Sequence, residues 1–260
     1  MRHPLFSCVI PVKGARPYLA DALASLSSQG LGGDLEIIIQ DGDVDPDKGQ
    51  SDALNRGFAK AHGDWLFWLN ADDILLPNAL KRVRDYILQN TAAKWIAGNE
   101  LFIDGDGYVL SCAVGPKGRM CLYRHAMPHV YGPSSFFRRE LFECVGGCDV
   151  ALKYCMDWDL WIKFSKLNVV PERMTAYLWA QRRWNGSKTQ RVLDAVEAVS
   201  QWDEINRMLD QNGLQCTMWG TRTMRLWRLL CGCYWREWID GLRLKGRRLG
   251  AVEASFLKKG

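Results

Sequence analysis

The stretch WLFWLNADDIL, residues 65–75, runs five apolar residues into an amide and then two adjacent carboxylates. A continuous apolar run of this kind predicts a short strand that is buried on both faces. The carboxylates Asp72 and Asp73 that follow it have three possible roles: a helix cap, a solvated turn or a cation site. The choice among these roles largely decides what the protein does.

Strand and helix patterns alternate before this stretch. The runs LFSCVIPV (5–12) and DLEIIIQDG (34–42) predict strands, whereas PYLADALASLSSQ (17–29) and SDALNRGFAKAHG (51–63) carry apolar residues at helical spacing. This order predicts an α/β fold in which a mostly parallel sheet is sandwiched by helices. In such sheets ligands bind beyond the carboxyl ends of the strands.

The second half of the chain predicts shorter-range pairings. Residues 95–112 read as a hairpin that turns at Asp104 to Gly107, residues 134–147 as a short helix closed by glycines, and residues 156–167 as an amphipathic helix. We expect one domain over residues 1–190, followed by a helical C-terminal extension over 191–260.

Composition narrows the possible functions. Of the 34 Lys and Arg residues, ten lie in residues 222–260 beside three of the 29 acidic residues, so the basic excess sits in the tail and does not favour a nucleic-acid binder. Nine scattered cysteines without a CxxC pair predict reduced thiols. No apolar run approaches the ~20 residues of a spanning helix, so we expect a cytoplasmic protein that is neither secreted nor threaded through a membrane.

The two carboxylates are too early in the chain to cap the next helix. Pro77 suits the first residue of a helix over PNALKRVRDYIL (77–88), which would make Leu76 the N-cap. Two carboxylates held at a strand end repel each other unless a cation lies beside them, and a divalent cation would complete its shell with phosphate oxygens. From the residues alone, a cation site and a solvated acidic turn remain equally open.

Four stretches, in this order, carry a resemblance to a known family: FSCVIPVKGARPYLADALASLSSQ, EIIIQDG, PDKGQSDALNRGFAKAHGDWLFWLNADDILLPNAL and GPSSFFRRELFECVGGCDVALKYCMDWDLWIKF. Over residues 5 to about 190 the chain resembles the family 2 glycosyltransferases of the GT-A fold, the inverting enzymes of bacterial polysaccharide and lipopolysaccharide assembly. The resemblance implies a nucleotide-sugar half over about 1–103 and an acceptor half over about 104–190.

The resemblance also implies a donor site. Where the family usually carries DxD, this chain has Asn70, Ala71 and Asp72, so Asp72 is the expected ligand of Mn²⁺ or Mg²⁺ and Asn70 the expected partner of the ribose or of a coordinated water. Pro11 and Asp41 end the first two strands, and Asp41 stands where relatives contact the nucleobase. The alternative for Asp41 is a turn residue before glycine. Only GDVDP (42–46) separates it from the next motif, so part of the usual nucleotide wall is missing or rebuilt.

The remaining donor candidates are mostly basic or amide side chains. Lys48 is a candidate for a phosphate contact beside a helix start, with Asp52 and Asn55 on the helix that follows. In the segment QRRWNGSKT (181–189), Arg182 and Lys188 align with a loop that closes over the diphosphate in relatives, where Trp184 replaces a common His. The alternatives are a solvated lysine, an acid that favours the helix dipole and a basic surface loop.

Asp157 is the expected catalytic base. In the resembled family the first Asp of this motif deprotonates the acceptor hydroxyl; here Met156 precedes it in place of a frequent Glu. The alternative is a helix N-cap. Asp159 lies about 200° further around the helix, so both carboxylates cannot face one cleft.

The basic tail predicts an amphipathic helix over residues 222–248. Trp227, Leu230, Tyr234, Trp238 and Leu242 recur at steps of three and four, with arginines on the other side. Either this helix packs on the domain, or it lies peripherally on the inner face of the plasma membrane.

The predicted function is an inverting transfer of a sugar from a nucleotide-diphosphate sugar to a hydroxyl of a glycan or lipid-linked saccharide, in cell-surface polysaccharide synthesis. A degenerate GT-A-fold subunit that binds glycans or acts as a scaffold is the non-enzymatic alternative. A nucleotidyltransferase is disfavoured because PVKGARP (11–17) offers one glycine where a phosphate loop needs several.

Overall fold

The computed structural model describes residues 3–118, 129–187, 198–215 and 217–252. Their strands form an eight-stranded sheet in the order β2-β1-β3-β7-β5-β8-β4, with β6 paired to β5. The strands are β1 (Phe6–Val12), β2 (Leu35–Asp41), β3 (Trp65–Trp68), β4 (Ile74–Leu75), β5 (Trp95–Ile103), β6 (Val109–Ala113), β7 (Ser135–Arg138) and β8 (Glu172–Arg182). The helices are α1 (Leu19–Ser27), α2 (Gln50–Lys60), α3 (Ala79–Gln89), α5 (Arg139–Cys144), α6 (Met156–Lys166), α8 (Ala198–Gln211), α9 (Met218–Leu230) and α10 (Cys233–Leu244).

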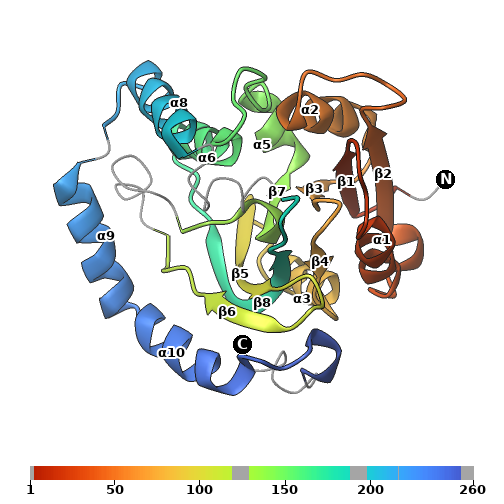
Figure 1. Ribbon diagram of the computed structural model, residues 1–260. Helices are drawn as coiled ribbons and strands as arrows, with labels where there is room; N and C mark the ends of the chain where they lie inside the picture. Colours follow the sequence, from red (N-terminus) through yellow and green to blue (C-terminus); the bar gives the residue numbers. More distant parts are fainter. Residues whose placement is uncertain (1–2, 119–128, 188–197, 216, 253–260) are drawn as a thin grey trace.

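Helices cover both faces of the sheet, as predicted (Figure 1). Residues of α2, α5, α6 and α8 share one buried cluster with the strands, whereas α1 and α3 share the other. The fold class expected from the sequence is therefore confirmed. The cleft described below lies at the carboxyl ends of β1 and β3, where the topology rule places ligands.

The sheet is mixed, and the parallel arrangement is confined to part of it. The pairs β1–β2, β1–β3 and β5–β8 are parallel, whereas β3–β7, β4–β8, β5–β6 and β5–β7 are antiparallel. Part of this difference comes from SSFF (134–137), which we expected to be helical. Phe136 and Phe137 alternate between the two cores, a period of two that builds β7, and the helix begins only at Arg139.

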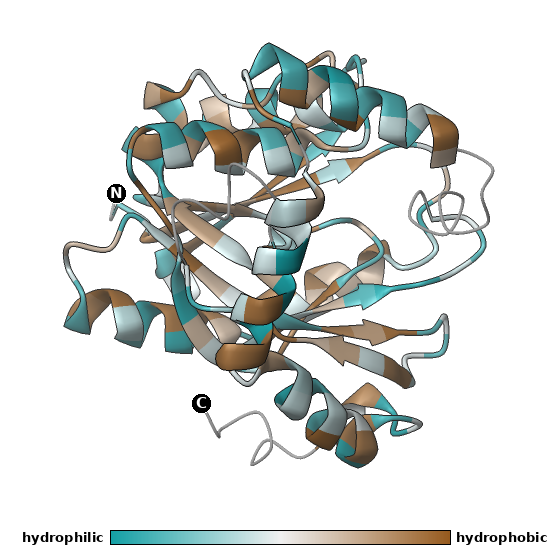
Figure 2. Ribbon diagram, turned by 90° about the vertical axis from the view of Figure 1, so that its left-hand side faces the viewer, coloured by the Kyte–Doolittle hydropathy of each residue, from teal (hydrophilic) through white to brown (hydrophobic). Residues whose placement is uncertain are grey.

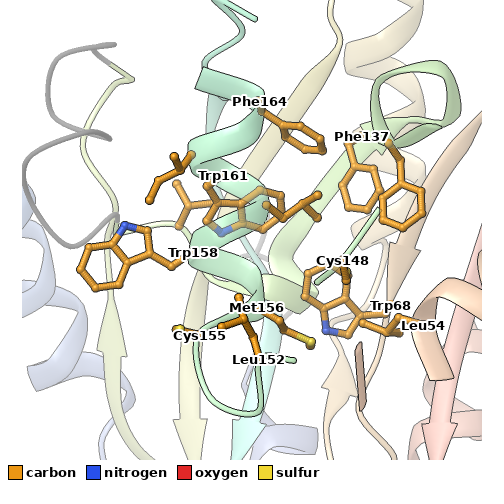
Figure 3. Packing of buried hydrophobic residues seen from close by; sticks show 14 of the residues in the cluster. Leu54, Trp68, Phe137, Cys148, Leu152, Cys155, Met156, Trp158, Trp161 and Phe164 are labelled. Atoms are coloured by element: carbon orange, nitrogen blue, oxygen red, sulfur yellow. The ribbon is translucent and has the colours of Figure 1, made fainter. Parts of the chain in front are cut away.

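A stack of aromatic rings fixes α6 against the sheet (Figure 3). The ring of Trp161 lies 4.7 Å from that of Trp95 and 6.0 Å from that of Trp68, both nearly parallel to it. Phe137 packs edge-on against the same ring, and Phe164 lies tilted to it by 51°. Such pairs contribute about 0.5–1.5 kcal/mol each beyond their burial, so the start of α6 is held rigidly relative to β3 and β5.

The tail forms two helices instead of one. Gly232 adopts a left-handed conformation with φ of 71°, which L side chains rarely adopt, and it separates α9 from α10. The two helices follow each other in an arc along one side of the domain (Figure 1). No helix of the described residues is long and apolar enough to cross a bilayer.

These two helices bury two charged side chains against the domain and expose several apolar ones. Arg228 and Asp240 are buried, and Asp240 accepts a hydrogen bond from the hydroxyl of Tyr177 in β8. Six of the exposed apolar residues, which we call the outer face, are Leu226, Leu229, Leu230, Trp235, Trp238 and Leu242. Brown segments alternate with teal along these helices in Figure 2, which looks onto their side of the molecule. Leu230, Trp238 and Leu242 are exposed, so the alternative in which the apolar side packs on the domain is wrong for these three residues.

Candidate active site

A cavity of about 560 Å³ opens at the carboxyl ends of β1 and β3. Of the residues predicted for the donor site, Pro11, Lys48, Asn70, Asp72 and Arg182 line it, although they come from widely separated segments. Asp41, Asp52, Asn55 and Asp157 are not among the lining residues, and Lys188 lies outside the described residues.

Asp72 faces the cavity and is bonded to the tryptophan that replaces a common histidine. The indole N–H of Trp184 donates a hydrogen bond of 2.8 Å to Oδ2 of Asp72. The Trp184 ring lies edge-on to Tyr18 at 5.5 Å, and a Cβ at Gly186 would overlap it. The indole therefore occupies one of the two oxygens of the expected metal ligand.

Asp73 is directed into the protein instead. Its side chain is 1 % exposed; Oδ1 accepts from the backbone N–H of Arg182 at 2.9 Å, and Oδ2 accepts from the amide of Asn70 at 2.7 Å. Burial, together with the charge of Asp72, raises the pKa of Asp73 well above its usual range. Asp72 thus faces the cavity, whereas Asp73 is a buried structural residue. Neither caps α3, as predicted. The helix begins at Ala79 with Asn78 as its N-cap, and not at Pro77 with Leu76 as its N-cap.

Arg182 lines the cavity while its guanidinium holds the surrounding loops together. The side chain is 3 % exposed and donates to the backbone oxygens of Asp72 at 3.0 Å and Gly105 at 2.7 Å. It also pairs with Asp21 at 3.0 Å and lies 4.2 Å from the centroid of the Tyr18 ring. These contacts tie the Asp72 turn to the hairpin and to α1.

Arg16, which no motif singled out, joins the strand end at Asp41 to the shortened segment. Its guanidinium binds both oxygens of Asp41 at 2.7 and 2.8 Å and reaches Asp43 at 2.7 Å. The bond to Arg16 lowers the pKa of Asp43. Arg16 lines the cavity and thus connects it to Asp41 and to the shortened GDVDP segment.

Asp52 and Asn55 of α2 bind the backbone of two neighbouring loops. Asp52 accepts from the backbone N–H of Lys48 at 3.0 Å and pairs with Arg56. Asn55 makes two hydrogen bonds to the backbone of Cys148, at 2.8 and 2.9 Å, across the loop between α5 and α6. Both side chains therefore order loops next to the cavity.

Asp157 lies in the first turn of α6 and is not its N-cap, which is Cys155. One oxygen of Asp157 accepts from the backbone N–H of Trp158 at 2.8 Å. Asp159 is buried against Lys163, with which it forms an ion pair at 2.8 Å, so the two carboxylates point different ways as expected. A carboxylate at a helix N-terminus is stabilised in its charged form.

Glu204 of α8 fixes the loop that leads into α6. Its carboxylate accepts hydrogen bonds from the backbone N–H groups of Lys153, Tyr154 and Cys155, at 2.6–3.0 Å. Lys153 lines the cavity, so this clamp links α8 to both the cavity and the catalytic candidate. The sequence offered no signal for it, because the partners are backbone groups.

Glu100 is a buried carboxyl that sequence reasoning missed because it lies inside an apolar strand. It is 0 % exposed, and neither oxygen has a hydrogen-bond partner among the described residues. Burial is the main cause that raises its pKa, followed by the charge of Asp73; Asp157 acts in the same direction, whereas Arg173 and Arg183 oppose it. Glu100 therefore interacts electrostatically with both Asp73 and Asp157.

Glu100→Gln should stabilise the protein, and by more at pH 8 than at pH 5. The folded state retains a proton that the unfolded chain releases above its ordinary pKa, so stability is lost as pH rises toward the folded pKa. Between the ordinary pKa and the folded-state pKa, the difference in free energy of unfolding between variant and wild type should grow by up to about 1.4 kcal/mol per pH unit. Urea unfolding at both pH values measures it, with exposed Glu140→Gln as the control. A gap that does not change with pH would contradict a buried proton at Glu100.

The residues at the triplet fit a divalent cation through few protein ligands. Asp72 retains Oδ1, whereas Oδ1 of Asn70 accepts from Gln50 at 2.9 Å and Asp73 is buried. No cluster of three or more His, Cys, Asp or Glu that could hold a metal occurs within the described ranges. Mg²⁺ is often bound by one or two carboxylates with water and substrate phosphates, so one ligand at Asp72 is chemically sufficient.

Comparisons with known proteins find similarity to glycosyltransferases. Residues 43–146 match the model of the family Glycosyl transferase family 2. The chain is 28 % identical over 194 residues to an uncharacterized glycosyltransferase of Rickettsia prowazekii, which covers 64 % of this chain and 60 % of that relative. It is 27 % identical over 216 residues to a PGL/p-HBAD biosynthesis glycosyltransferase of Mycobacterium tuberculosis, covering 72 % and 80 %.

Two solved structures are similar in fold. The mannosyltransferase PcManGT of Pyrobaculum calidifontis, in complex with GDP-Man and Mn²⁺, matches with a TM-score of 0.58 and 14 % identity over 98 % of this chain and 80 % of its own. A fragment of S. aureus TarS in complex with UDP matches with a TM-score of 0.55 and 14 % identity, covering 82 % and 66 %. The fold is therefore that of the GT-A glycosyltransferases. Residues 43–146 carry a domain of glycosyl transferase family 2, which confirms the resemblance found in the sequence.

Proposed function

We propose that this protein transfers a sugar, with inversion, from a nucleotide-diphosphate sugar to a hydroxyl of a glycan or lipid-linked saccharide. The observation that carries the proposal is the cavity that joins Pro11, Lys48 and Asp72 at the strand ends. Its lining includes Lys13, Arg16 and Lys153 in addition, which suits a doubly charged diphosphate. A role in cell-surface polysaccharide synthesis is part of the proposal.

In this mechanism Asp157 accepts the proton of the acceptor hydroxyl while that oxygen attacks the anomeric carbon from the face opposite the diphosphate. Lys48 and Lys153, with Lys188, stabilise the negative charge of the leaving nucleoside diphosphate. Asn70 and Asp41 orient the nucleoside. A divalent cation held by Asp72 would supply further charge neutralisation at the diphosphate when bound.

Metal dependence is tested at Asp72. Millimolar Mn²⁺ or Mg²⁺ should raise the affinity for UDP or GDP by at least about tenfold, equivalent to ~1.4 kcal/mol. Asp72→Ala should abolish this gain because Asp72 supplies the available carboxylate oxygen. Titration calorimetry with and without a chelator measures both, and Asp106→Asn, on the exposed hairpin turn, is the control. Equal nucleotide affinity with and without metal would remove the metal from the proposal.

The proposal includes peripheral contact with the inner face of the plasma membrane through residues 222–248. Its support is the outer face of α9 and α10, which exposes 66 % of Trp235, 56 % of Trp238 and 71 % of Leu242. Arg222, Arg225 and Arg243 are exposed on the same helices and would meet anionic headgroups. Co-sedimentation with anionic vesicles tests this contact, and Trp235→Ser with Trp238→Ser should weaken it.

A further inference from the structure

A second cavity, of about 410 Å³, lies where α9 and α10 meet the sheet, apart from the active-site lining. Two strands, the segment after β6 and both helices build it. Asn99 comes from β5, Arg173, Met174 and Thr175 from β8, and Val114, Gly115 and Lys117 from the segment after β6. The helices add Trp227, Leu230, Cys231, Gly232, Cys233 and Arg236 around the break between them.

This cavity combines three cations with an apolar wall. Arg173 donates to the side-chain oxygen of Asn99 at 3.2 Å, and Arg236 donates to the backbone oxygen of Thr175 and pairs with Asp240. The side chain of Lys117 is exposed, while its backbone oxygen accepts from the indole of Trp227 at 2.9 Å. Asp240 pairs with Arg236, and the exposed side chain of Lys117 adds a positive charge at the cavity.

His129, whose backbone oxygen bonds to Arg173, lies in the same positive field. Burial lowers the pKa of His129 to about 4, and the charges of Arg228 and Arg173 act in the same direction. His129 is therefore neutral at physiological pH, and its backbone oxygen accepts from Arg173 at 3.4 Å. An anion in the cavity would therefore face arginine and lysine, and not histidine, as its cations.

The mouth of the cavity is continuous with the outer face. Leu230 lines the cavity and is 69 % exposed, and Leu226 and Leu229 on the same helix are 56 % and 60 % exposed. A polar ligand without an aliphatic part would leave these side chains in water. A ligand that carries an anionic head and a hydrocarbon chain would satisfy both the cations and the rim.

We propose that this cavity binds the phosphate group of an anionic membrane phospholipid, whose acyl chains lie along the outer face of α9. The proposal rests on the membrane contact proposed above and adds a specific headgroup site to it. Lys117 and Arg236 bind the phosphate oxygens as charge-assisted donors. The lipid would thereby fix α9 and α10 on the bilayer in one orientation, which a diffuse attraction between basic residues and anionic lipid does not do.

Cys231 provides a direct readout because it lines the cavity and is partly exposed. The full chain is alkylated with N-ethylmaleimide, with or without dihexanoyl phosphatidylglycerol below its micelle concentration, and the modification of each cysteine is followed by peptide mass spectrometry. The lipid should slow alkylation of Cys231 several-fold and leave exposed Cys144 unchanged within the same molecules. Lys117→Gln should remove this protection, whereas the charge-matched Arg243→Gln, at an exposed position of α10, should keep it.

Two further ligands test whether the cavity recognises phosphate alone, any short-chain lipid, or the anionic lipid. Inorganic phosphate alone and dihexanoyl phosphatidylcholine should each protect Cys231 much less than the anionic lipid. The proposal is overturned if phosphate or the zwitterionic lipid protects equally, if protection survives Lys117→Gln, or if no protection is seen. Nucleotide titration of the same proteins separates this result from the transferase proposal, because Lys117→Gln should leave affinity for the nucleoside diphosphate unchanged.

Discussion

Asp157→Asn should reduce sugar transfer by ~100-fold or more while donor affinity and melting temperature stay close to those of the wild type. The amide cannot take a proton from the acceptor hydroxyl, but its oxygen can still accept the hydrogen bond from the backbone N–H of Trp158. Because Cys155, not Asp157, is the N-cap of α6, the substitution removes no cap. The initial rate with a matched donor and acceptor measures the loss.

Asp159→Asn, two residues further along the same helix, is the control. Asp159 is buried, pairs with Lys163 at 2.8 Å and accepts from Asn212 of the segment after α8. Its substitution should therefore lower the melting temperature and change turnover little. Normal transfer by Asp157→Asn would mean that another group takes the proton, and the assignment of the base would be wrong.

Arg182→Met should destabilise the fold by about 2–4 kcal/mol, because two partly buried backbone oxygens lose their charged donor, whereas the exposed carboxylate of Asp21 contributes little. The backbone oxygens of Asp72 and Gly105 would lose their donor, and Asp21 would lose its cation. At roughly 2–4 °C per kcal/mol for a domain of this size, a fall of about 4–16 °C in melting temperature is expected in calorimetry without any nucleotide.

This result separates two roles for Arg182. A residue whose main task is to neutralise the diphosphate would affect nucleotide affinity and leave the stability of the free protein nearly unchanged. Lys153→Met is the matched comparison, since Lys153 also lines the cavity but is not buried. A large stability loss at position 182 and none at 153 would support a role for Arg182 in positioning the Asp72 turn.

The sequence predicted best where a pattern is local and repeated. The apolar runs of β1 and β3 and the hairpin around Asp104 to Gly107 were found because their periodicity reflects burial directly. The strand β7 was missed because four residues, SSFF, are too few to separate a period of 2 from one of 3.6. Its alternation became visible only when Phe136 and Phe137 were seen in opposite cores.

The candidate site was predictable only as far as its motifs reach. The positions of Lys48, Asn70 and Asp72 around one cavity follow from strand ends that the sequence marks. The bond from Trp184 to Asp72 and the pairing of Arg16 with Asp41 join residues 112 and 25 positions apart, and no periodicity encodes such partners. Glu100 was hidden for the opposite reason, because a carboxyl within an apolar strand breaks the pattern without indicating what surrounds it.

The hydrogen bonds of Glu204 make α8 and the loop before α6 structurally dependent on each other, so the two segments must evolve together. The predicted division at residue 190 would assign α8 to the extension, yet α8 supplies Ile205, Met208 and Leu209 to the main core and clamps the loop before α6. Recombination between relatives at residue 190 would therefore pair a foreign helix with a loop that it must hold by three hydrogen bonds. A crossover between α8 and α9 would leave this clamp intact, although Asp240 and Arg236 of α10 would still have to match Tyr177 and Thr175 of β8.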